Sequence, residues 1–272
     1  MKIINQLPKM RKTALITGAS SGIGRCMAEI MRKKGFDLII TGRNCRELLA
    51  LCEKLGRDHV TAVSADLSDA SECTALYQFS RRYPVCVLIN NAGFGVYGEF
   101  SEVKLKEEIK MLDVNVRAVH ILTKLFLNDF IRRDKGYILN VSSAAAFMPG
   151  PFMSGYYAGK SYVLRQVIAI REELRRRGSH VRICALCPGP VDTDFNRRAG
   201  VRGSFKGINA EYAALSGING MFKGRTVIIP GLKMQLVCAA GSILPQEITA
   251  AVNYYIQKRK SLGQNAQNAE AL

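Results

Sequence analysis

The stretch TALITGASSGIG, residues 13–24, decides the fold. Its first five residues are apolar or β-branched, as in a buried strand, and its last three begin an amphipathic segment that runs to about Lys34. A turn between strand and helix that is rich in glycine lets the backbone approach a pyrophosphate, and the helix supplies free N–H groups and a positive dipole end. We predict dinucleotide binding here, with an ordinary tight turn as the alternative. The residues concerned are Gly18, Ser20, Ser21, Gly22, Ile23 and Gly24.

The alternation of a short β-branched run with a longer amphipathic segment recurs about six times along the chain. This order is typical of an α/β, doubly wound, Rossmann-type parallel sheet flanked by helices, here of about seven strands. The expected strands are 13–17, 37–41, 59–66, 85–90, 137–143, 181–187 and 226–230; the expected helices are 22–34, 44–55, one from about 69, 104–132 and 154–177. No linker interrupts the alternation before residue 188. We therefore expect a single domain over 1–260, irregular structure over 188–223, and a polar, flexible tail over 261–272.

Net charge is +17 over 272 residues, which raises the possibility of a nucleic-acid partner. The basic residues, however, form short clusters at expected helix ends, and no zinc-finger motif or basic region interleaved with aromatics is present. We therefore expect no nucleic-acid partner. The longest apolar candidate for a membrane span, 232–244, contains Lys233 and Gln235 and is shorter than the ~20 residues that a helix needs to cross a bilayer.

Eight cysteines are scattered through the chain, many of them in apolar segments where a free thiol behaves as a small hydrophobe. With no signal-peptide pattern at the N-terminus, they favour a reducing, cytoplasmic location. Cys184 and Cys187 form the one CxxC, but they lie in an expected strand, so their side chains should point to opposite faces. No second Cys/His pair accompanies them, and we predict no metal site.

Further motifs follow in order along the chain: NNAG at 90–93, Asn115 within DVNV, NVSS at 140–143, YYAGK at 156–160 and PGPVDT at 188–193. Together with TGASSGIG they resemble the short-chain dehydrogenase/reductase family in order and spacing, over residues 13 to about 195. GVRGSF at 200–205 and VIIPG at 227–231 are more loosely similar to its bacterial ketoacyl- and ketosteroid-reductase branch. The resemblance implies an oxidoreductase that interconverts a ketone and a secondary alcohol.

Arg43 follows the second expected strand, at the position that faces the adenosine ribose in a dinucleotide fold. An acidic residue there would bind the ribose hydroxyls of NAD, whereas an arginine pairs with the extra phosphate of NADP. Asp37 begins the strand at its opposite end and cannot take the NAD role. We expect NADP(H) as the cofactor, with a solvated arginine at a helix start as the alternative.

A tyrosine must have its pKa of about 10 shifted to act near neutral pH. Tyr156 and Lys160 are four residues apart on one expected helix, so the ammonium should lie on the same face and lower the pKa of the phenol. Tyr157 is three residues from Lys160, and geometry alone does not exclude it; the family pattern YxxxK selects Tyr156. Ser143 ends the fifth expected strand, where ligands of open α/β folds bind, and we expect it to hold the substrate carbonyl. Ser142 should point away and be structural.

The resemblance implies further roles. Asp66 would accept a hydrogen bond from the adenine amino group, with a helix N-cap as the alternative, and Leu67 would wall the ring. Asn115 would hold a water that links Lys160 to solvent, and Lys160 would also hold the nicotinamide ribose. Other expected cofactor contacts are Asn91, Ala92, Gly93, Pro188, Gly189, Val191 and Thr193.

The segment 194–225 resembles a mobile substrate lid, and its apolar residues, such as Phe195, Val201, Phe205, Met221 and Phe222, suggest a hydrophobic substrate unless they pack on the sheet. A 3-oxoacyl thioester or a ketosteroid fits this description. We expect a homodimer or homotetramer, and arginines 132, 133, 171 and 175–177 could receive an acidic acyl carrier protein. A non-catalytic NADP-binding regulator or scaffold is the alternative function, and the four intact catalytic positions disfavour it.

Overall fold

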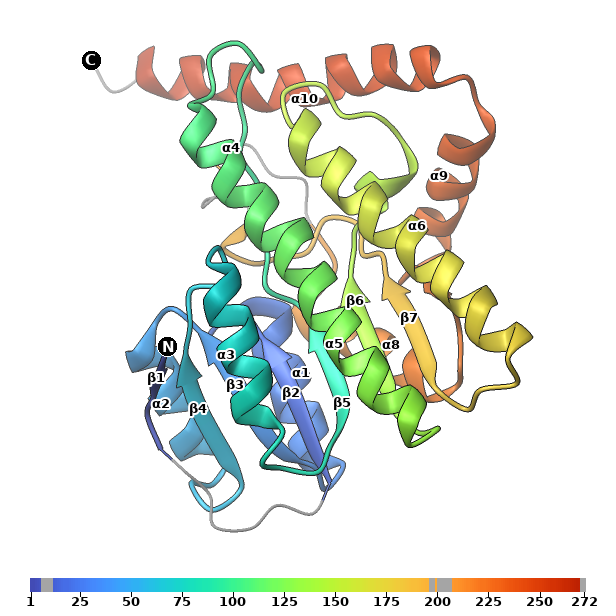
Figure 1. The fold of residues 1–272 in the computed structure, drawn as a ribbon. Helices are drawn as coiled ribbons and strands as arrows, with labels where there is room; N and C mark the ends of the chain where they lie inside the picture. Colours follow the sequence, from blue (N-terminus) through green and yellow to red (C-terminus); the bar gives the residue numbers. More distant parts are fainter. Residues whose placement is uncertain (6–11, 196–198, 200–206, 270–272) are drawn as a thin grey trace.

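The apolar runs of the sequence form the strands of one sheet. The computed structural model describes residues 1–5, 12–195, 199 and 207–269, with side chains as far as residue 259. Within these residues the sheet has eight strands in the order β1-β4-β3-β2-β5-β6-β7-β8 (Figure 1). The strands are β1 (Lys2–Ile3), β2 (Thr13–Thr17), β3 (Asp37–Gly42), β4 (Val60–Ser64), β5 (Val85–Asn90), β6 (Tyr137–Val141), β7 (Arg182–Leu186) and β8 (Val227–Ile228).

All strands from β2 to β8 pair in parallel, which confirms the prediction of a doubly wound α/β domain. The short strand β1 is an addition that the sequence did not reveal, and it pairs antiparallel with β4, with Lys2 opposite Ser64. The chain first adds β3 and β4 on one side of β2 and then β5 to β8 on the other. Ligands of open α/β sheets bind at the carboxyl ends of strands where the order reverses, here between β2 and β5.

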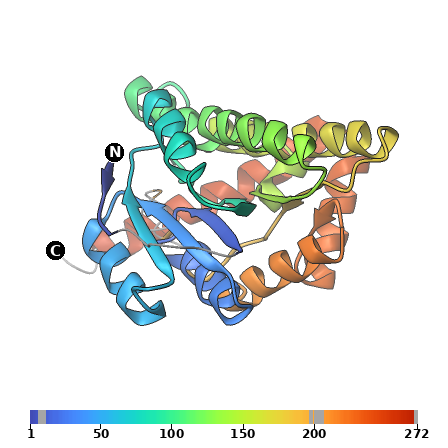
Figure 2. The same ribbon diagram turned by 60° about the horizontal axis from the view of Figure 1, so that its bottom comes forward.

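Helices cover both faces of the sheet (Figure 2). They are α1 (Gly22–Lys33), α2 (Cys45–Leu55), α3 (Ala70–Ser80), α4 (Leu105–Leu112), the π-helix η1 (Asp113–Ala118), α5 (Val119–Arg132), the 3₁₀-helix η2 (Ala144–Phe147), α6 (Ser154–Arg176), α8 (Ala210–Phe222), α9 (Leu232–Ile243) and α10 (Gln246–Ala269). One core lies between the sheet and α3, α5 and α6, and the other between the sheet and α1, α2 and α8. Because side chains alternate along a strand, Leu15 enters the first core and Ile16 the second.

Helix α8 corrects the expectation of irregular structure over 188–223, whereas the substrate lid expected over 194–225 stays a prediction. Ala214, Ile218 and Met221 are fully buried in the core beneath α8. Gly217 permits this packing, because a Cβ there would lie only 2.9 Å from Leu186 Cδ2. The alternative that the apolar residues pack on the sheet is therefore correct for Met221, while Val201 and Phe205 lie outside the described residues.

The C-terminal segment ends in a helix. Helix α10 continues to Ala269, and the flexibility expected of residues 261–272 stays a prediction. Once a helix has formed, each added residue contributes a further hydrogen bond, and residues such as Lys, Leu, Gln and Ala carry it forward readily. Among the described residues, no helix is both long and apolar enough to cross a membrane.

The two thiols of the CxxC do lie on opposite sides of the sheet. Cys184 belongs to the core beneath α1 and α8, and Cys187 to the core beneath α5 and α6. Burial raises the pKa of both thiols, that of Cys187 to about 12. In the part of the chain that the structure describes, no group of three or more His, Cys, Asp or Glu side chains is arranged to hold a metal ion.

Candidate active site

The turn from β2 to α1 forms a tight cradle at the carboxyl edge of the sheet. Gly18 has a φ of +66°, and a Cβ there would lie 2.8 Å from Ala92 Cα, so a larger residue would be strained and would clash. Gly24 is also close-packed, because its Cβ would lie 2.3 Å from the Gly18 carbonyl oxygen. Ser21 is the N-cap of α1, and its side chain makes no capping hydrogen bond to the first turn. The predicted glycine turn at the start of a helix is thus present.

The turn after β7 comes to the same cradle. Thr193 Cγ2 lies 3.2 Å from the position that a Cβ on Gly22 would take. Upstream, the Pro188 carbonyl accepts a hydrogen bond from the Ala144 backbone N–H at 2.8 Å, and Val191 forms a parallel bridge with Ile208. The structure therefore brings PGPVDT beside TGASSGIG, although about 165 residues separate the two motifs in the sequence.

A cavity of about 390 Å³ lies at the ends of β3 and β4, beside β1. Its lining includes Arg43 and Asp66, both predicted at the adenosine end of the cofactor, together with Lys2 and Glu72, which the sequence did not single out. The Glu72 carboxylate accepts a hydrogen bond from the Asp66 backbone N–H at 2.7 Å. Lys2 was missed because a strand of two residues has no recognisable pattern.

Asp66 is not the helix N-cap that was kept as its alternative role. The N-cap of α3 is Asp69, whose side chain accepts a hydrogen bond from the Ser71 backbone N–H at 2.7 Å. Burial of Asp66 raises the pKa of its carboxyl, but hydrogen bonds from Ser68 and Lys110 outweigh burial and lower it. Leu67 is buried in the core on the α3 side of the sheet.

The NNAG motif ties the centre of the sheet to the cradle. Asn90 Nδ2 donates to Asn140 Oδ1 at 2.9 Å, between β5 and β6. Asn91 Nδ2 donates to the carbonyls of Thr17 and Gly18 at 3.0 and 3.1 Å. Asn91 therefore fixes the turn between β2 and α1.

Gly93 is the point at which two of the predicted catalytic residues meet. A Cβ on Gly93 would lie 2.9 Å from Asn115 Oδ1 and 3.3 Å from Lys160 Nζ. Asn115 lies in the π-helix η1, and its amide exchanges two hydrogen bonds with the Phe94 backbone, at 3.1 and 2.7 Å. A π-helix turn between α4 and α5 is a local irregularity of the kind that recurs at functional sites.

Lys160 is buried, with 4% of its surface exposed, and Nζ donates to the Val141 carbonyl at 2.9 Å. Burial lowers the pKa of Lys160 to about 8. Ser142 contributes to this arrangement, because its hydroxyl donates to the Lys160 carbonyl at 2.7 Å. The structural role predicted for Ser142 matches this contact.

Tyr156 lies beside Lys160 and Ser143, but one electrostatic prediction is wrong. Lys160 Nζ is 5.7 Å from the centre of the Tyr156 ring. Burial raises the pKa of Tyr156, a hydrogen bond with Ser143 lowers it only in part, and Lys160 is not a cause of the shift. The predicted decrease is absent because Lys160 is itself desolvated and directed to Val141.

Tyr157, the rival phenol, has a different partner. Its hydroxyl accepts a hydrogen bond from Gln257 Nε2 of α10 at 2.7 Å. Gln257 is 2% exposed and also accepts, through its backbone carbonyl, a hydrogen bond from the Tyr97 hydroxyl at 2.7 Å. Sequence reasoning missed Gln257 because it is about 100 residues from the tyrosine it binds and belongs to no motif.

An apolar cluster surrounds Tyr156. Its buried members besides Tyr156 are Met111, Ala145 and Met153, and the partly buried side chains packed against it are Phe94, Val96, Tyr97, Tyr157 and Phe195. The ring of Phe195 lies 5.4 Å from that of Tyr156, centre to centre. The candidate site therefore combines buried polar groups with apolar side chains around the tyrosine.

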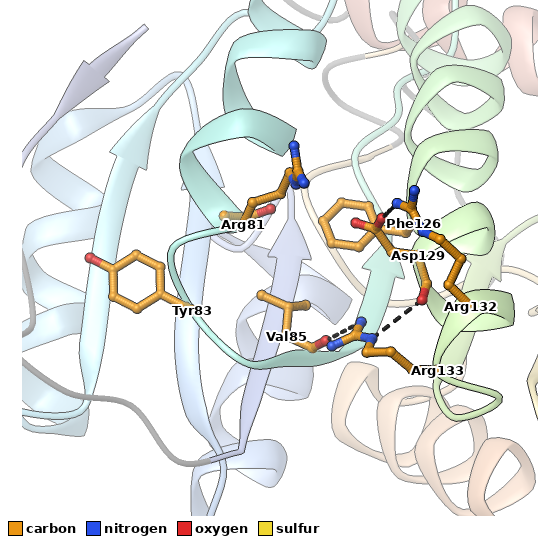
Figure 3. Close-up of a pocket in the computed structure, with 8 residues that line it drawn as sticks. Arg81, Tyr83, Val85, Phe126, Asp129, Arg132 and Arg133 are labelled. Carbon is orange, nitrogen blue, oxygen red and sulfur yellow. Dashed lines mark hydrogen bonds and ion pairs between the residues drawn. The ribbon is translucent and has the colours of Figure 1, made fainter.

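A second hollow, of about 290 Å³, lies at the opposite edge of the sheet, between the ends of α3 and α5 (Figure 3). Two of its arginines are engaged by other groups of the protein. Arg132 pairs with Asp129, and Arg133 Nη2 donates to the Val85 carbonyl at 3.0 Å. Val85 begins β5, so this hollow is at the amino ends of the strands. Open α/β folds bind ligands at the other edge, and the candidate active site is there.

We expect Gly93→Ala to lower kcat/KM for the enzyme's reaction by about 100-fold, since displacing catalytic groups by ~1 Å has effects of that size. The added methyl would contact both Asn115 Oδ1 and Lys160 Nζ. Gly155→Ala is the matched control, because its Cβ would meet only the flexible end of Met111, at 3.0 Å, and Glu108 Oε1 at 3.5 Å. Steady-state kinetics and thermal melting of both variants test this; equal activities would contradict it.

Comparisons with known proteins identify the family of this chain. A family model described as short chain dehydrogenase matches residues 12–202. The ketoacyl reductase HetN of Nostoc sp. is 33% identical over 184 residues, which are 66% of this chain and 63% of HetN, so the chain spans less than two thirds of that relative. The 3-oxoacyl-acyl-carrier-protein reductase FabG of Rickettsia prowazekii is 31% identical over 186 residues, which are 68% of this chain and 74% of FabG.

Among solved structures, a short-chain dehydrogenase from Sphingobium yanoikuyae in complex with NADPH has a TM-score of 0.77 and 28% identity, over 87% of this chain and 97% of that chain. The fold and these relatives are those of an oxidoreductase that acts on CH–OH groups. The chain belongs to the short-chain dehydrogenase family.

Proposed function

We propose that this protein is an NADPH-dependent reductase that converts a hydrophobic ketone to a secondary alcohol. The observation that carries the proposal is the convergence of Asn115 and Lys160 on Gly93, with Tyr156 and Ser143 beside them at the carboxyl edge of the sheet. Two ketoacyl reductases among the relatives and the NADPH complex among the structural neighbours support it.

The residues present fit a nicotinamide dinucleotide. The close-packed glycines of the β2–α1 turn leave a backbone cradle at the start of α1, where N–H groups and the helix dipole favour a pyrophosphate. Because Gly93 has no side chain, the backbone there comes close to Asn115 and Lys160, where a Cβ would be only 2.9 Å from Asn115 Oδ1. Thr193, next to Gly22, would complete the cofactor site at the nicotinamide end.

The choice of NADP(H) over NAD(H) rests on the cavity beside β1. Arg43 and Lys2 both line it, together with the carboxylates Asp66 and Glu72, and the two cations would pair with an adenosine 2′-phosphate bound there. An arginine fork pairs well with phosphate, whereas the ribose hydroxyls of NAD call for an acidic acceptor. Asp66, in the same cavity, would accept the adenine amino group.

In this mechanism Tyr156 donates a proton to the carbonyl oxygen of the substrate, and Ser143 holds that oxygen by a hydrogen bond. Burial raises the pKa of Tyr156, so the phenol is protonated at neutral pH and has a proton to donate, but a pKa nearer to neutral would make the transfer easier. Lys160, with a pKa of about 8, is charged in neutral solution and would return a proton toward Tyr156, and Asn115 would hold the path to solvent. The bound nicotinamide supplies the hydride.

The apolar cluster around Tyr156 supports a hydrophobic substrate such as a 3-oxoacyl thioester or a ketosteroid. The decisive experiment is a panel of 3-oxoacyl thioesters, ketosteroids and simple ketones, followed by the loss of NADPH absorbance with NADH in parallel. We expect consumption of NADPH that depends on an apolar ketone and is slower with NADH. If no carbonyl accelerates NADPH oxidation, the proposed function is wrong.

An acyl carrier protein is a candidate partner for the arginines at the ends of α5 and α6, although these ends lie at the amino edge of the sheet and the acyl group would have to reach the opposite edge. Arg175 and Arg176 pair with Glu172 at 2.7 and 2.8 Å, and Arg132 with Asp129, but such exposed pairs contribute little and are readily exchanged. We expect reduction of a thioester carried by an acidic carrier protein to slow as salt rises from 50 to 300 mM, by roughly tenfold in kcat/KM, through screening of association. The same acyl group on a small thiol should show little salt dependence. A carrier-bound substrate that also shows little would exclude this partner.

The remaining expectations are a homodimer or homotetramer and a cytoplasmic location. The long helices α5 and α6 lie side by side on one face of the sheet (Figure 1), as an assembly through that face would require. The eight cysteines, all within described residues and all free, suit a reducing compartment. Light scattering of the purified chain tests the oligomeric state.

A further inference from the structure

Helix α10 is inverted relative to an ordinary surface helix. Thr249, Asn253 and Gln257, spaced four residues apart, are only 7%, 7% and 2% exposed. Ile248 and Val252, on the other side of the helix, are 53% and 54% exposed. A helix packed on a protein in water normally turns its apolar stripe inward. The outer side of α10 therefore has the composition of a surface that something else covers.

The polar inner side of α10 is held in place by specific contacts. Asn253 Nδ2 donates to the Pro149 carbonyl at 2.8 Å, and Gln257 Nε2 donates to the Tyr157 hydroxyl at 2.7 Å. The ring of Tyr254 packs on that of Phe152, with centres 5.2 Å apart. These contacts fix the rotation of α10 about its own axis. Ile248 and Val252 are therefore held on the outward side of the helix.

Helix α9 continues the apolar exterior. It leads directly into α10, and the two helices form one border of the molecule (Figure 1). We define the apolar face as the exposed side chains Leu232, Leu236 and Ile243 of α9 and Ile248, Val252 and Tyr255 of α10; all are more than half exposed, and Ile243 reaches 82%. Single exposed apolar residues are ordinary, but six of them, each more than half exposed, on two consecutive helices indicate an interaction surface.

The charge of α9 and α10 distinguishes between two possible partners of the apolar face, a second copy of the chain and a lipid surface. The segment 232–259 carries three cations, Lys233, Lys258 and Arg259, and one carboxylate, Glu247. A symmetric contact between two copies would bring two such segments, each of net charge +2, into one interface in a chain of net charge +17. An anionic lipid surface instead attracts the cations while its acyl region accepts the apolar side chains.

We propose that α9 and α10 dock this protein on the surface of an anionic membrane, with the apolar face at the boundary of headgroups and acyl chains. The docking is interfacial, because among the described residues no helix can span a bilayer. Since Gln257 on the inner side of α10 binds the neighbour of Tyr156, the membrane and the candidate active site lie on the two sides of one helix. The proposal concerns this face alone and does not depend on the reaction.

Cosedimentation of the full chain with lipid vesicles tests the proposal. We expect binding to vesicles of equal parts phosphatidylglycerol and phosphatidylcholine, and much weaker binding to phosphatidylcholine alone. Ile248→Ser/Val252→Ser should weaken the binding to anionic vesicles by about tenfold, since two buried apolar side chains are lost. Tyr212→Ser/Leu215→Ser on α8, with side chains 48% and 42% exposed, is the matched control and should bind as the unchanged chain does.

Leu232→Ser/Leu236→Ser on α9 gives an independent second test if the α10 variant fails to fold, as judged by circular dichroism. The proposal is overturned if the unchanged chain stays in the supernatant with anionic vesicles, or if folded variants of the apolar face sediment as it does. It is also overturned if these variants convert a dimer to a monomer in light scattering while no form binds vesicles, since a second copy would then be the occupant. Ketone reduction without vesicles is scored separately, so either proposal can fail alone.

Discussion

Replacing Tyr156 with Phe is expected to lower kcat for ketone reduction by 10²–10⁴-fold, the usual contribution of a positioned proton donor. The change removes only the hydroxyl. The ring that packs on Phe195 at 5.4 Å and lies 5.7 Å from Lys160 Nζ remains. NADPH binding, measured by the change in nicotinamide fluorescence, should therefore be unaffected, and the loss should be confined to turnover.

The control is Tyr157→Phe, which removes the neighbouring hydroxyl on the same helix. That hydroxyl is engaged by Gln257 Nε2 at 2.7 Å, so its loss should disturb the contact of α10 and leave most of kcat intact. The two variants resolve an ambiguity that spacing alone left open. If Tyr157→Phe abolished turnover and Tyr156→Phe preserved it, the roles assigned to these two tyrosines would be exchanged.

The parallel sheet could be predicted because its signals are local. Strands such as Thr13–Thr17 and Val85–Asn90 are buried on both faces of the sheet. Their sequences are therefore mostly apolar without interruption, a pattern that distinguishes them from elements exposed on one side. The residues that the motifs single out come together because parallel strands place their carboxyl ends at one edge. The meeting of Asn115 and Lys160 at Gly93 is a consequence of that topology.

What could not be predicted depends on contacts distant in sequence. Lys2 lines the same cavity as Arg43 only because the two residues of β1, Lys2 and Ile3, pair with β4. The π-helix turn that holds Asn115 has no sequence pattern, and Gln257 reaches Tyr157 across 100 residues. Helix α10 is the clearest case, because its apolar residues would be placed inside by any rule of amphipathicity, whereas hydrogen bonds turn them outward.

The direction of the pKa shift of Tyr156 also could not be predicted from the sequence. A spacing of four residues places Lys160 near the phenol, and that much was predicted correctly. The direction of the shift depends on solvation, and burial of both groups works against the charged form of each. Sequence spacing reports which groups are neighbours, but the balance between desolvation and charge can be judged only once the surroundings are known.

Arg43→Asp is expected to raise the dissociation constant of NADPH by about 100-fold, because a charge-assisted hydrogen bond contributes up to about 3 kcal/mol and each 1.4 kcal/mol is a factor of ten. NADH lacks the 2′-phosphate and should bind as well as before or better, since an aspartate can accept its ribose hydroxyls. Fluorescence titration with both cofactors measures the two constants. Lys2→Ala, in the same cavity, should weaken NADPH in the same direction but less, because an ammonium lacks the bidentate fork.

Arg46→Asp is the matched control for Arg43→Asp, since it makes the same change of charge three residues further on, at an exposed position outside the cavity lining. It should leave the ratio of NADPH to NADH affinity nearly unchanged, apart from a small long-range effect that salt removes. If both variants changed the ratio equally, general charge and not a phosphate contact would set the preference. An unchanged NADPH affinity in Arg43→Asp would remove the argument for NADP(H), while the hydride-transfer reaction and the role of Tyr156 would stand, because they depend on the other end of the cofactor.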